Sequence, residues 1–279
     1  VSQVSEAPYQ RYITENILLP LGMSNTYWEF DEVTPERLAI GYRYEDDEWK
    51  LEPMLHDGAY GSMGGLITTI EDFSKYVSFH LSAWPPRNEP DNGPVRRSSL
   101  REMQTPQYPR LNSQATDYEG EPCPVMSGYG YGLGITNYCN TLVRVSHGGA
   151  LPGFGSNYAF YPEYGIGIMA FGNRTYTTPY PYDEIAHLIF DSLELSTREL
   201  PVSDILKERK EQVVTMLKTW DESLENEILA ENFYLDESRE PRRVYINEQF
   251  EQLGEQYSVG PIQPYNQLRG QFDIEGEKG

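Results

Sequence analysis

The sequence is poor in cysteine, in basic residues and in long apolar runs. Two cysteines among 279 residues are too few for a disulfide scaffold or a metal site. Only 22 Lys and Arg stand against 43 Asp and Glu, a formal net charge of -21, which argues against nucleic acid and anionic membrane surfaces as partners. No run of about 18 apolar residues occurs, so no transmembrane helix is expected.

What the sequence does contain indicates a globular protein. Hydrophobic residues make up 38% of the chain, and 22 tyrosines are present, so a sizeable core can form in one large domain or two smaller ones. Cys123 and Cys139 are 16 positions apart and leave two alternatives open. They form one disulfide if the compartment is oxidising, or they remain two unrelated thiols.

Residue periodicity predicts a mixed order of helices and strands. A helix at 7–18 stops at Pro20 and Gly22, and Thr68 or Thr69 caps a second helix that ends at Leu81. The other expected elements are a hairpin at 39–51, a surface loop at 83–97, a short helix capped by Ser98 or Ser99, one Gly-rich strand at 128–135, three strands within 144–173 and a helix at 179–193.

The chain changes character after residue 198, which predicts two domains at 1–198 and 199–279. The second begins with charged helices expected at 203–219, 222–232 and 241–256. It ends on Gly276-Glu277-Lys278-Gly279, which is typical of a hairpin turn without its second strand. The chain is therefore expected to stop within a small α+β appendage.

Five stretches occur in an order that carries a family resemblance. They are "YITENILLPLGMSNTYW", "GSMGGLITTIEDFSKYV", "SSLREMQTP", "YGYGLGI" and "SHGGALPGFGS". Together they resemble the class C beta-lactamase-like serine hydrolases, the family of penicillin-binding proteins, D-aminopeptidases and related esterases. The resemblance covers about residues 5–195. It implies an α/β (α+β) fold with an antiparallel central sheet.

The resemblance also implies a chemistry built from three elements. These are a Ser-x-x-Lys that provides nucleophile and base, a Tyr-x-Asn that moves protons, and a Lys-Thr-Gly or His-x-Gly strand edge that faces both. His147-Gly148-Gly149 matches the third element, at what the sequence predicts to be a strand end. Ala150 N–H would then be an oxyanion donor, His147 would lie near the substrate carboxylate or leaving group, and Gly148 and Tyr131 would contact substrate. The alternative for His147 is a hydrogen-bonded core histidine.

The first two elements are not found in the sequence. None of the six lysines has a serine three positions before it, and only Lys218 has a hydroxyl there, from Thr215. Tyr138 and Tyr245 each begin a Tyr-x-Asn, but neither lies before "PLGM", where the family has it. We therefore expect a C-terminal portion of a longer hydrolase whose nucleophile lies outside these residues. A non-catalytic binding or scaffolding relative is the alternative.

Other chemistries have weaker support. Ser62 in "YGSMG" lacks the first glycine and the preceding strand of a nucleophile elbow, and His56-Asp57 lacks further metal ligands. "GYGLG" at 130–134 is not followed by a helix, which argues against a dinucleotide loop. We expect no cofactor, a small-molecule or peptide substrate and, from the family alone, the bacterial periplasm or cell envelope. The oligomeric state stays open.

Overall fold

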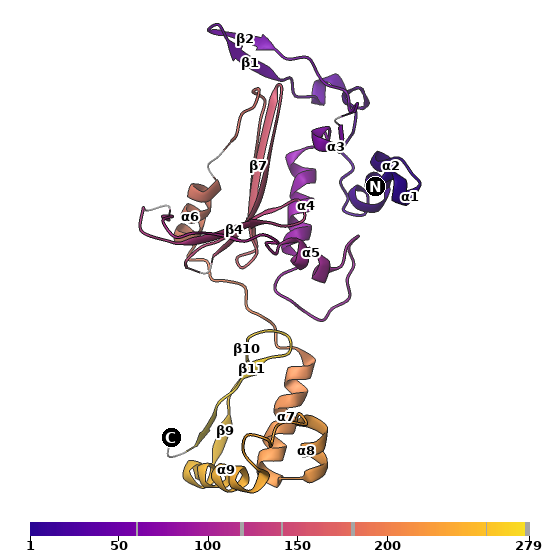
Figure 1. The fold of residues 1–279 in the computed structure, drawn as a ribbon. Helices are drawn as coiled ribbons and strands as arrows, with labels where there is room; N and C mark the ends of the chain where they lie inside the picture. The colour runs from indigo at the N-terminus through magenta and orange to yellow at the C-terminus, as the bar shows by residue number, and fades with distance from the viewer. Residues whose placement is uncertain (60, 118–119, 141, 180–181, 255, 277–279) are drawn as a thin grey trace. The chain divides into compact units, whose positions relative to one another are not determined.

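The computed structural model describes the chain except residues 60, 118–119, 141, 180–181, 255 and 277–279. The chain forms two compact units (Figure 1). The larger unit comprises Val1–Pro85 and Pro90–Arg198, and the smaller comprises Pro86–Glu89 and Glu199–Gly279. In the described part of the chain, no helix has the length and apolar character needed to span a membrane.

A six-stranded antiparallel sheet forms the centre of the larger unit, which confirms the predicted fold class. Each strand pairs with the next one along the chain, in the order β3-β4-β5-β6-β7-β8. The strands are β3 (Arg110–Asn112), β4 (Val125–Tyr129), β5 (Gly134–Asn137), β6 (Val143–Leu151), β7 (Phe154–Tyr161) and β8 (Ile166–Gly172). Pro152 and Gly153 join β6 to β7, and Gly153 has a φ of 85°. Pro followed by a glycine of positive φ suits a type II turn.

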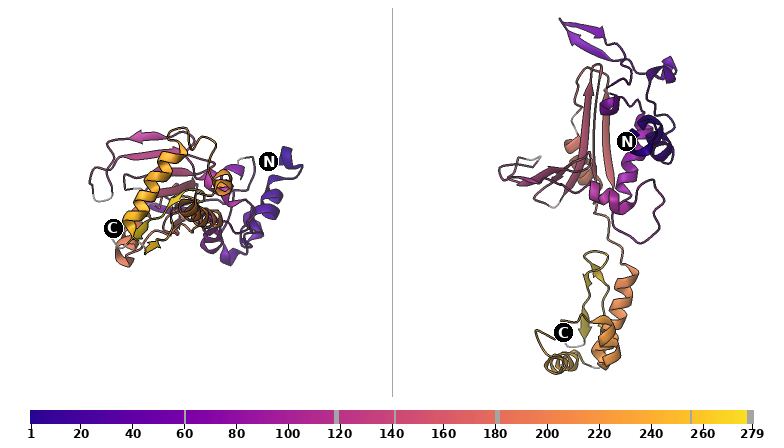
Figure 2. Two further views of the ribbon diagram at one scale, coloured as in Figure 1. Left: turned by 90° about the horizontal axis from the view of Figure 1, so that it is seen from below. Right: turned by 45° about the vertical axis from the view of Figure 1, so that its right-hand side comes forward.

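Two helices cover opposite faces of this sheet (Figures 1 and 2). They are α4 (Ile70–Leu81) and α6 (Tyr182–Leu193). The core on the α4 face contains Val77, Leu81, Leu133, Ile135, Val145 and Phe160. The core on the α6 face contains Leu142, Ala159, Tyr161 and Ala186. Because strand side chains alternate between faces, the odd-numbered residues of β6 lie on the α4 face together with Val145.

The start of α4 is fixed by a buried carboxylate. The Thr69 hydroxyl accepts a hydrogen bond from the Asp72 N–H at 3.1 Å, which confirms the predicted cap. The Asp72 side chain, only 1% exposed, accepts from Asn25 N–H at 2.6 Å and from Lys75 Nζ at 2.7 Å. Burial acts to raise the pKa of Asp72, but the Lys75 ammonium and the Asn25 N–H hold it below its ordinary value. Asp72 thus ties α4 to the segment that follows the N-terminal helices.

The first fifty residues form helical turns and a hairpin. The helix expected at 7–18 is present as α2 (Tyr9–Ile13) followed by the π-helical turn η1 (Thr14–Leu18). Asp46 and Asp47 have φ values of 55° and 61°, as a type I′ turn requires, and they join the two strands of the predicted hairpin. The remaining elements of this region are α1 (Ser2–Ser5), the 3-10 turns η2 (Phe30–Glu32) and η3 (Pro35–Arg37), β1 (Tyr42–Glu45) and β2 (Glu48–Leu51).

Three local predictions are wrong. The helix α5 (Arg97–Met103) begins after Arg96, so Ser98 and Ser99 lie inside its first turn and do not cap it. The stretch 128–135 is not one strand, because Gly130 N–H bonds to the Leu133 carbonyl and turns β4 into β5. Finally, β6 does not end at His-Gly-Gly but continues to Leu151, where the Pro-Gly turn begins.

The described residues of the smaller unit form three helices and two short strand pairs. Ser203 caps α7 (Asp204–Thr219) by accepting from Leu206 N–H. Glu225 of the smaller unit is only 3% exposed and accepts hydrogen bonds from Arg239 and Tyr234. The other elements are α8 (Glu222–Ile228), α9 (Arg239–Leu253), β9 (Tyr257–Val259) paired with β12 (Ile274–Gly276), and β10 (Gln263–Pro264) paired with β11 (Gly270–Gln271). The turn expected at 276–279 falls largely outside the described residues.

Candidate active site at the edge of strand β6

Strand β6 has a neighbour on both sides for only part of its length. Its pairing with β5 runs from Val143 to Ser146, where β5 begins at Gly134. Its pairing with β7 continues from Val145 to Leu151 without a bulge. Residues 147–151 therefore have β7 on one side and no paired strand on the other, among the residues described. This open edge contains His147, Gly148, Gly149 and Ala150, all of them exposed.

The pairing of β6 with its neighbours determines which way the backbone N–H and C=O groups of this edge point. In an antiparallel sheet, successive residues direct their N–H and C=O groups to opposite neighbours. The Leu142 carbonyl accepts from Tyr138 N–H, so the even-numbered residues of β6 face the β5 side. The same alternation directs the N–H and C=O groups of Gly148 and Ala150 into the open edge, and those of Gly149 toward Ser156 of β7. An extended backbone or an oxyanion placed there would meet main-chain donors.

Gly148 and Gly149 leave both faces of this part of β6 without side chains. A Cβ on Gly148 would lie 2.6 Å from the Asn157 side-chain oxygen, and a Cβ on Gly149 would lie 3.1 Å from the Ser156 hydroxyl. At the first distance the Asn157 side chain, which is buried, would have to shift. Gly148 thus suits the close packing on the α6 face, whereas Gly149 lies on the α4 face next to His147.

His147 is exposed on the α4 face and, among the residues that the structure describes, has one side-chain hydrogen-bond partner. Its Nε2 lies 3.0 Å from the hydroxyl of Tyr129, a residue of β4 that the sequence did not single out. On the other side His147 pairs with Tyr158 in β7. Burial raises the pKa of Tyr158 well above its ordinary value, since Phe73 and Tyr76 pack against its ring. The exposure of the His147 side chain argues against the alternative of a core histidine.

A buried carboxylate fixes the loop beyond the end of this edge. Asp57, 5% exposed, accepts from the Tyr9 hydroxyl at 2.7 Å and from Gln10 Nε2 at 2.6 Å. Burial, together with the Asp57 carboxylate, raises the pKa of Tyr9 to about 12. The other Asp57 oxygen packs against Gly61 and Gly65, where any Cβ would overlap it. These contacts hold α3 (Gly61–Gly64), and the Leu151 side chain lies about 3.6 Å from where a Gly64 Cβ would be.

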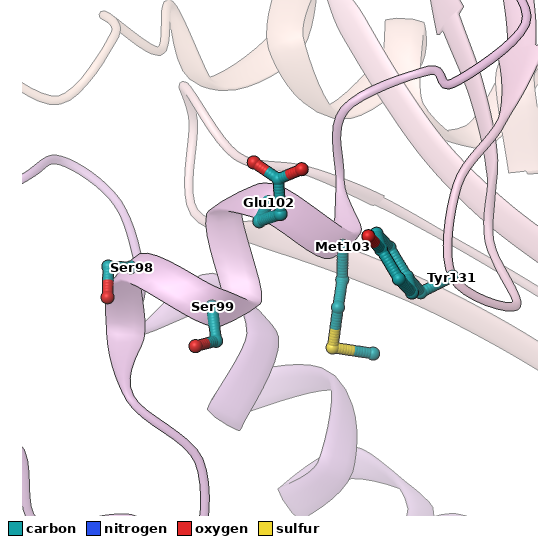
Figure 3. Close-up of a pocket in the computed structure, with 5 residues that line it drawn as sticks. All are labelled: Ser98, Ser99, Glu102, Met103 and Tyr131. Atoms are coloured by element: carbon teal, nitrogen blue, oxygen red, sulfur yellow. The ribbon is translucent and has the colours of Figure 1, made fainter.

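Tyr131 is an exposed residue of the β4–β5 turn. It lines a hollow of about 430 Å³ together with residues of α5 (Figure 3). The other residues that line the hollow are Ser98, Ser99, Glu102 and Met103. Neither His147 nor Ala150 contributes to it. A direct contact between Tyr131 and a substrate on the β6 edge therefore stays a prediction, without a shared cavity to support it.

The remaining candidate residues have structural roles. Thr215 bonds to the Glu211 carbonyl within α7, and Lys218 lies over the Tyr257 ring, so they do not form a nucleophile pair. The ring of Tyr138 packs under the Arg144 guanidinium, and Tyr245 lies within α9.

The two other sites that the sequence suggested also lack support. No strand directly precedes Ser62 in described residues 52–59, and Tyr60 lies outside the description. His56 bonds to Glu29, and the described residues contain no group of three potential metal ligands. Cys123 and Cys139 form a disulfide, which decides between the two alternatives for them.

Comparison with known proteins identifies the family. The family model described as Beta-lactamase matches residues 1–191. The chain belongs to the Beta-lactamase family. "Beta-lactamase-like protein 4" of Dictyostelium discoideum is 28% identical over 166 residues, covering 59% of this chain and 27% of that protein. "Unguisins hydrolase ungD" of Aspergillus violaceofuscus is 27% identical over 183 residues, covering 61% and 30%. The chain thus matches less than a third of the length of either relative.

A solved structure shows the same fold. The octameric penicillin-binding protein homologue from Pyrococcus abyssi superposes with a TM-score of 0.52 at 24% identity, covering 68% of this chain and 39% of that one. At this identity the likeness concerns the fold alone. The Beta-lactamase family includes hydrolases, as the name of the Aspergillus relative states.

Proposed function

We propose that this chain supplies the strand-edge part of a serine hydrolase that cleaves an amide or ester through an acyl-enzyme. The open edge of β6 carries the proposal. It offers main-chain groups of Gly148 and Ala150 beside an exposed His147, in a chain of the Beta-lactamase family. Two glycines let a substrate backbone approach closely.

The chemistry divides between this chain and residues outside it. A serine hydroxyl attacks the substrate carbonyl, its proton passes to a lysine or tyrosine base, and a tetrahedral oxyanion forms. Ala150 N–H and the N–H of the serine donate to that oxyanion, and its collapse expels the protonated leaving group. Water then repeats the sequence on the acyl-enzyme. Because no Ser-x-x-Lys occurs among the 279 residues, the serine and lysine belong to a longer parent protein, and this chain alone is inactive.

Substrate and location are part of the same proposal. A histidine in place of the strand lysine favours a peptidase or esterase over an efficient beta-lactamase. Disulfides such as Cys123–Cys139 form and persist in oxidising compartments, which supports a periplasmic or cell-envelope location. The substrate is a small molecule or a peptide that can adopt an extended backbone.

Labelling with a fluorophosphonate probe tests the proposal. We expect the folded parent protein to be labelled and the 279-residue chain to remain unlabelled, since the probe needs an activated serine. Folded parent protein that is never labelled would leave a non-catalytic binding or scaffolding protein as the function. Labelling of the 279-residue chain that disappears in Ser62→Ala would place the nucleophile here and overturn the division proposed above.

A further inference from the structure

Tyr129 is the one residue in the described part of the chain whose side chain hydrogen-bonds to His147. Its hydroxyl lies 3.0 Å from Nε2, and the two ring centroids are 6.1 Å apart. The two residues come from different strands, β4 and β6, with the short strand β5 between them. Tyr129 thus reaches across the point where β5 begins and the open edge starts.

The position of Tyr129 is fixed by its backbone. Its carbonyl accepts a hydrogen bond from Gln107 N–H at 3.0 Å. A Cβ on Gly130 would overlap the Met103 carbonyl oxygen, so the chain passes directly against the end of α5. At the other end of the hairpin, the disulfide joins the residues that flank β4 and β5. These contacts fix the backbone of Tyr129, while its side chain is exposed and meets His147 through its hydroxyl.

The hydrogen bond can run in either direction, because a phenol both donates and accepts and the imidazole proton can lie on either ring nitrogen. When the phenol donates, it does so to the unprotonated Nε2. A ring that accepts at Nε2 carries its own proton on Nδ1. No described residue hydrogen-bonds to Nδ1 of His147, so that N–H remains available for a ligand.

We propose that Tyr129 is a positioning residue that holds His147 in its Nδ1–H tautomer and turns this N–H toward a ligand on the β6 edge. Only the identity of that ligand, a hydrolase substrate, rests on the proposed function. An Nδ1–H donor suits a substrate carboxylate or carbonyl oxygen, which accepts hydrogen bonds. Without Tyr129, the ring would exchange tautomers and rotate, and the donor would be present only part of the time.

The tautomer can be measured in the 279-residue chain, without any activity. Long-range ¹H–¹⁵N spectra of the imidazole rings, recorded at mildly alkaline pH, distinguish Nδ1–H from Nε2–H in each of the four histidines. The His147 signals are assigned by their loss in His147→Asn. We expect the Nδ1–H pattern in the unmodified chain and a shift toward Nε2–H in Tyr129→Phe. Tyr131→Phe, which removes the hydroxyl of the neighbouring exposed tyrosine, is the control and should leave His147 unchanged.

An Nε2–H pattern in the unmodified chain, or a His147 signal equally unchanged in both variants, would overturn the inference. The unmodified chain tests it even if Tyr129→Phe does not fold. In an active parent protein, Tyr129→Phe should lower kcat/KM about 3- to 10-fold, or about 0.7–1.4 kcal/mol at 1.4 kcal/mol per tenfold. Failure of the proposed function would appear as an unlabelled parent protein, and the tautomer result would stand apart from it.

Discussion

The direction of the Ala150 N–H can be tested by deleting it. Ala150→Pro removes this group, which faces the open edge and has no partner among the described residues. Gly149→Pro removes the adjacent N–H, which faces Ser156 of β7. Proline is tolerated in a strand where its missing N–H faces away from the neighbouring strand, and not where a ladder bond is lost. The two variants therefore differ in which N–H they remove, and Gly149→Pro also adds a Cβ that would lie 3.1 Å from the Ser156 hydroxyl.

The expected magnitudes differ accordingly. Gly149→Pro leaves the Ser156 carbonyl without its donor, which costs about 1–3 kcal/mol of unfolding free energy. For a unit of this size that corresponds to a decrease in melting temperature of about 2–12 °C. Ala150→Pro should cost less than about 1 kcal/mol, as a substitution that breaks no internal hydrogen bond.

Thermal and urea unfolding of the 279-residue chain measure the difference directly. In an active parent protein, Ala150→Pro should also lower kcat about 100- to 1000-fold, as removal of one oxyanion donor does. Equal destabilisation by both prolines would mean that the Ala150 N–H is used inside the fold. The reasoning about the open edge, and with it the oxyanion role of Ala150, would then be wrong.

Three further outcomes follow from the structure. His147→Ala in the parent protein should lower kcat/KM by about 2–4 kcal/mol of transition-state energy with melting nearly unchanged; the reverse pattern, read from melting curves and kinetics on one sample, would make His147 structural. Burial lowers the pKa of His80 to about 4 from 6.5, so the unfolded chain binds a proton that the folded chain does not as pH falls between these values. Stability should therefore decrease over this window by about 3 kcal/mol, and urea titrations at several pH values should show this loss missing in His80→Gln, with an equal loss in both proteins counting against the assignment. Reduction of Cys123–Cys139, which are 16 residues apart, should lower the unfolding free energy by about 3 kcal/mol, measured with and without reductant against a Cys123→Ser, Cys139→Ser variant that reductant should not affect.

Elements with a local signal could be predicted from the sequence. Thr69 followed by Glu71 and Asp72 predicts a helix start, and the structure has the cap there, since capping involves residues three positions apart. The hairpin at 39–51 was also predicted, because Asp46 and Asp47 suit a turn. The order of three strands within 144–173 needed only alternating apolar residues and the breaks at Pro152 and Pro162.

The Gly-rich stretch 128–135 shows where local patterns mislead. Aromatic residues at every second position suggested one strand, but Gly132 has a φ of 77°, which only a turn requires. The glycines that looked like strand residues were the turn signal. The alternating pattern also gave no sign of the hydrogen bond to His147, which comes from Tyr129 at the end of β4.

The open edge itself could not be predicted. It exists because β5 has four residues and β6 has nine, and because their register aligns Gly134 with Ser146. Register depends on contacts between distant segments, which no window of sequence reports. The motif His-Gly-Gly indicated which residues matter, but not that the strand continues past them or which of their N–H groups faces outward.

An unpaired strand edge is also a site where chains can add to one another. Exposed main-chain donors and acceptors are a template for a further strand, and proteins limit such edges by keeping them short, interrupted or charged. Here the edge spans 147–151, contains two glycines that weaken extended pairing, and belongs to a chain of net charge -21. Its shortness, its glycines and the net negative charge of the chain all act against sheet-to-sheet growth into aggregates.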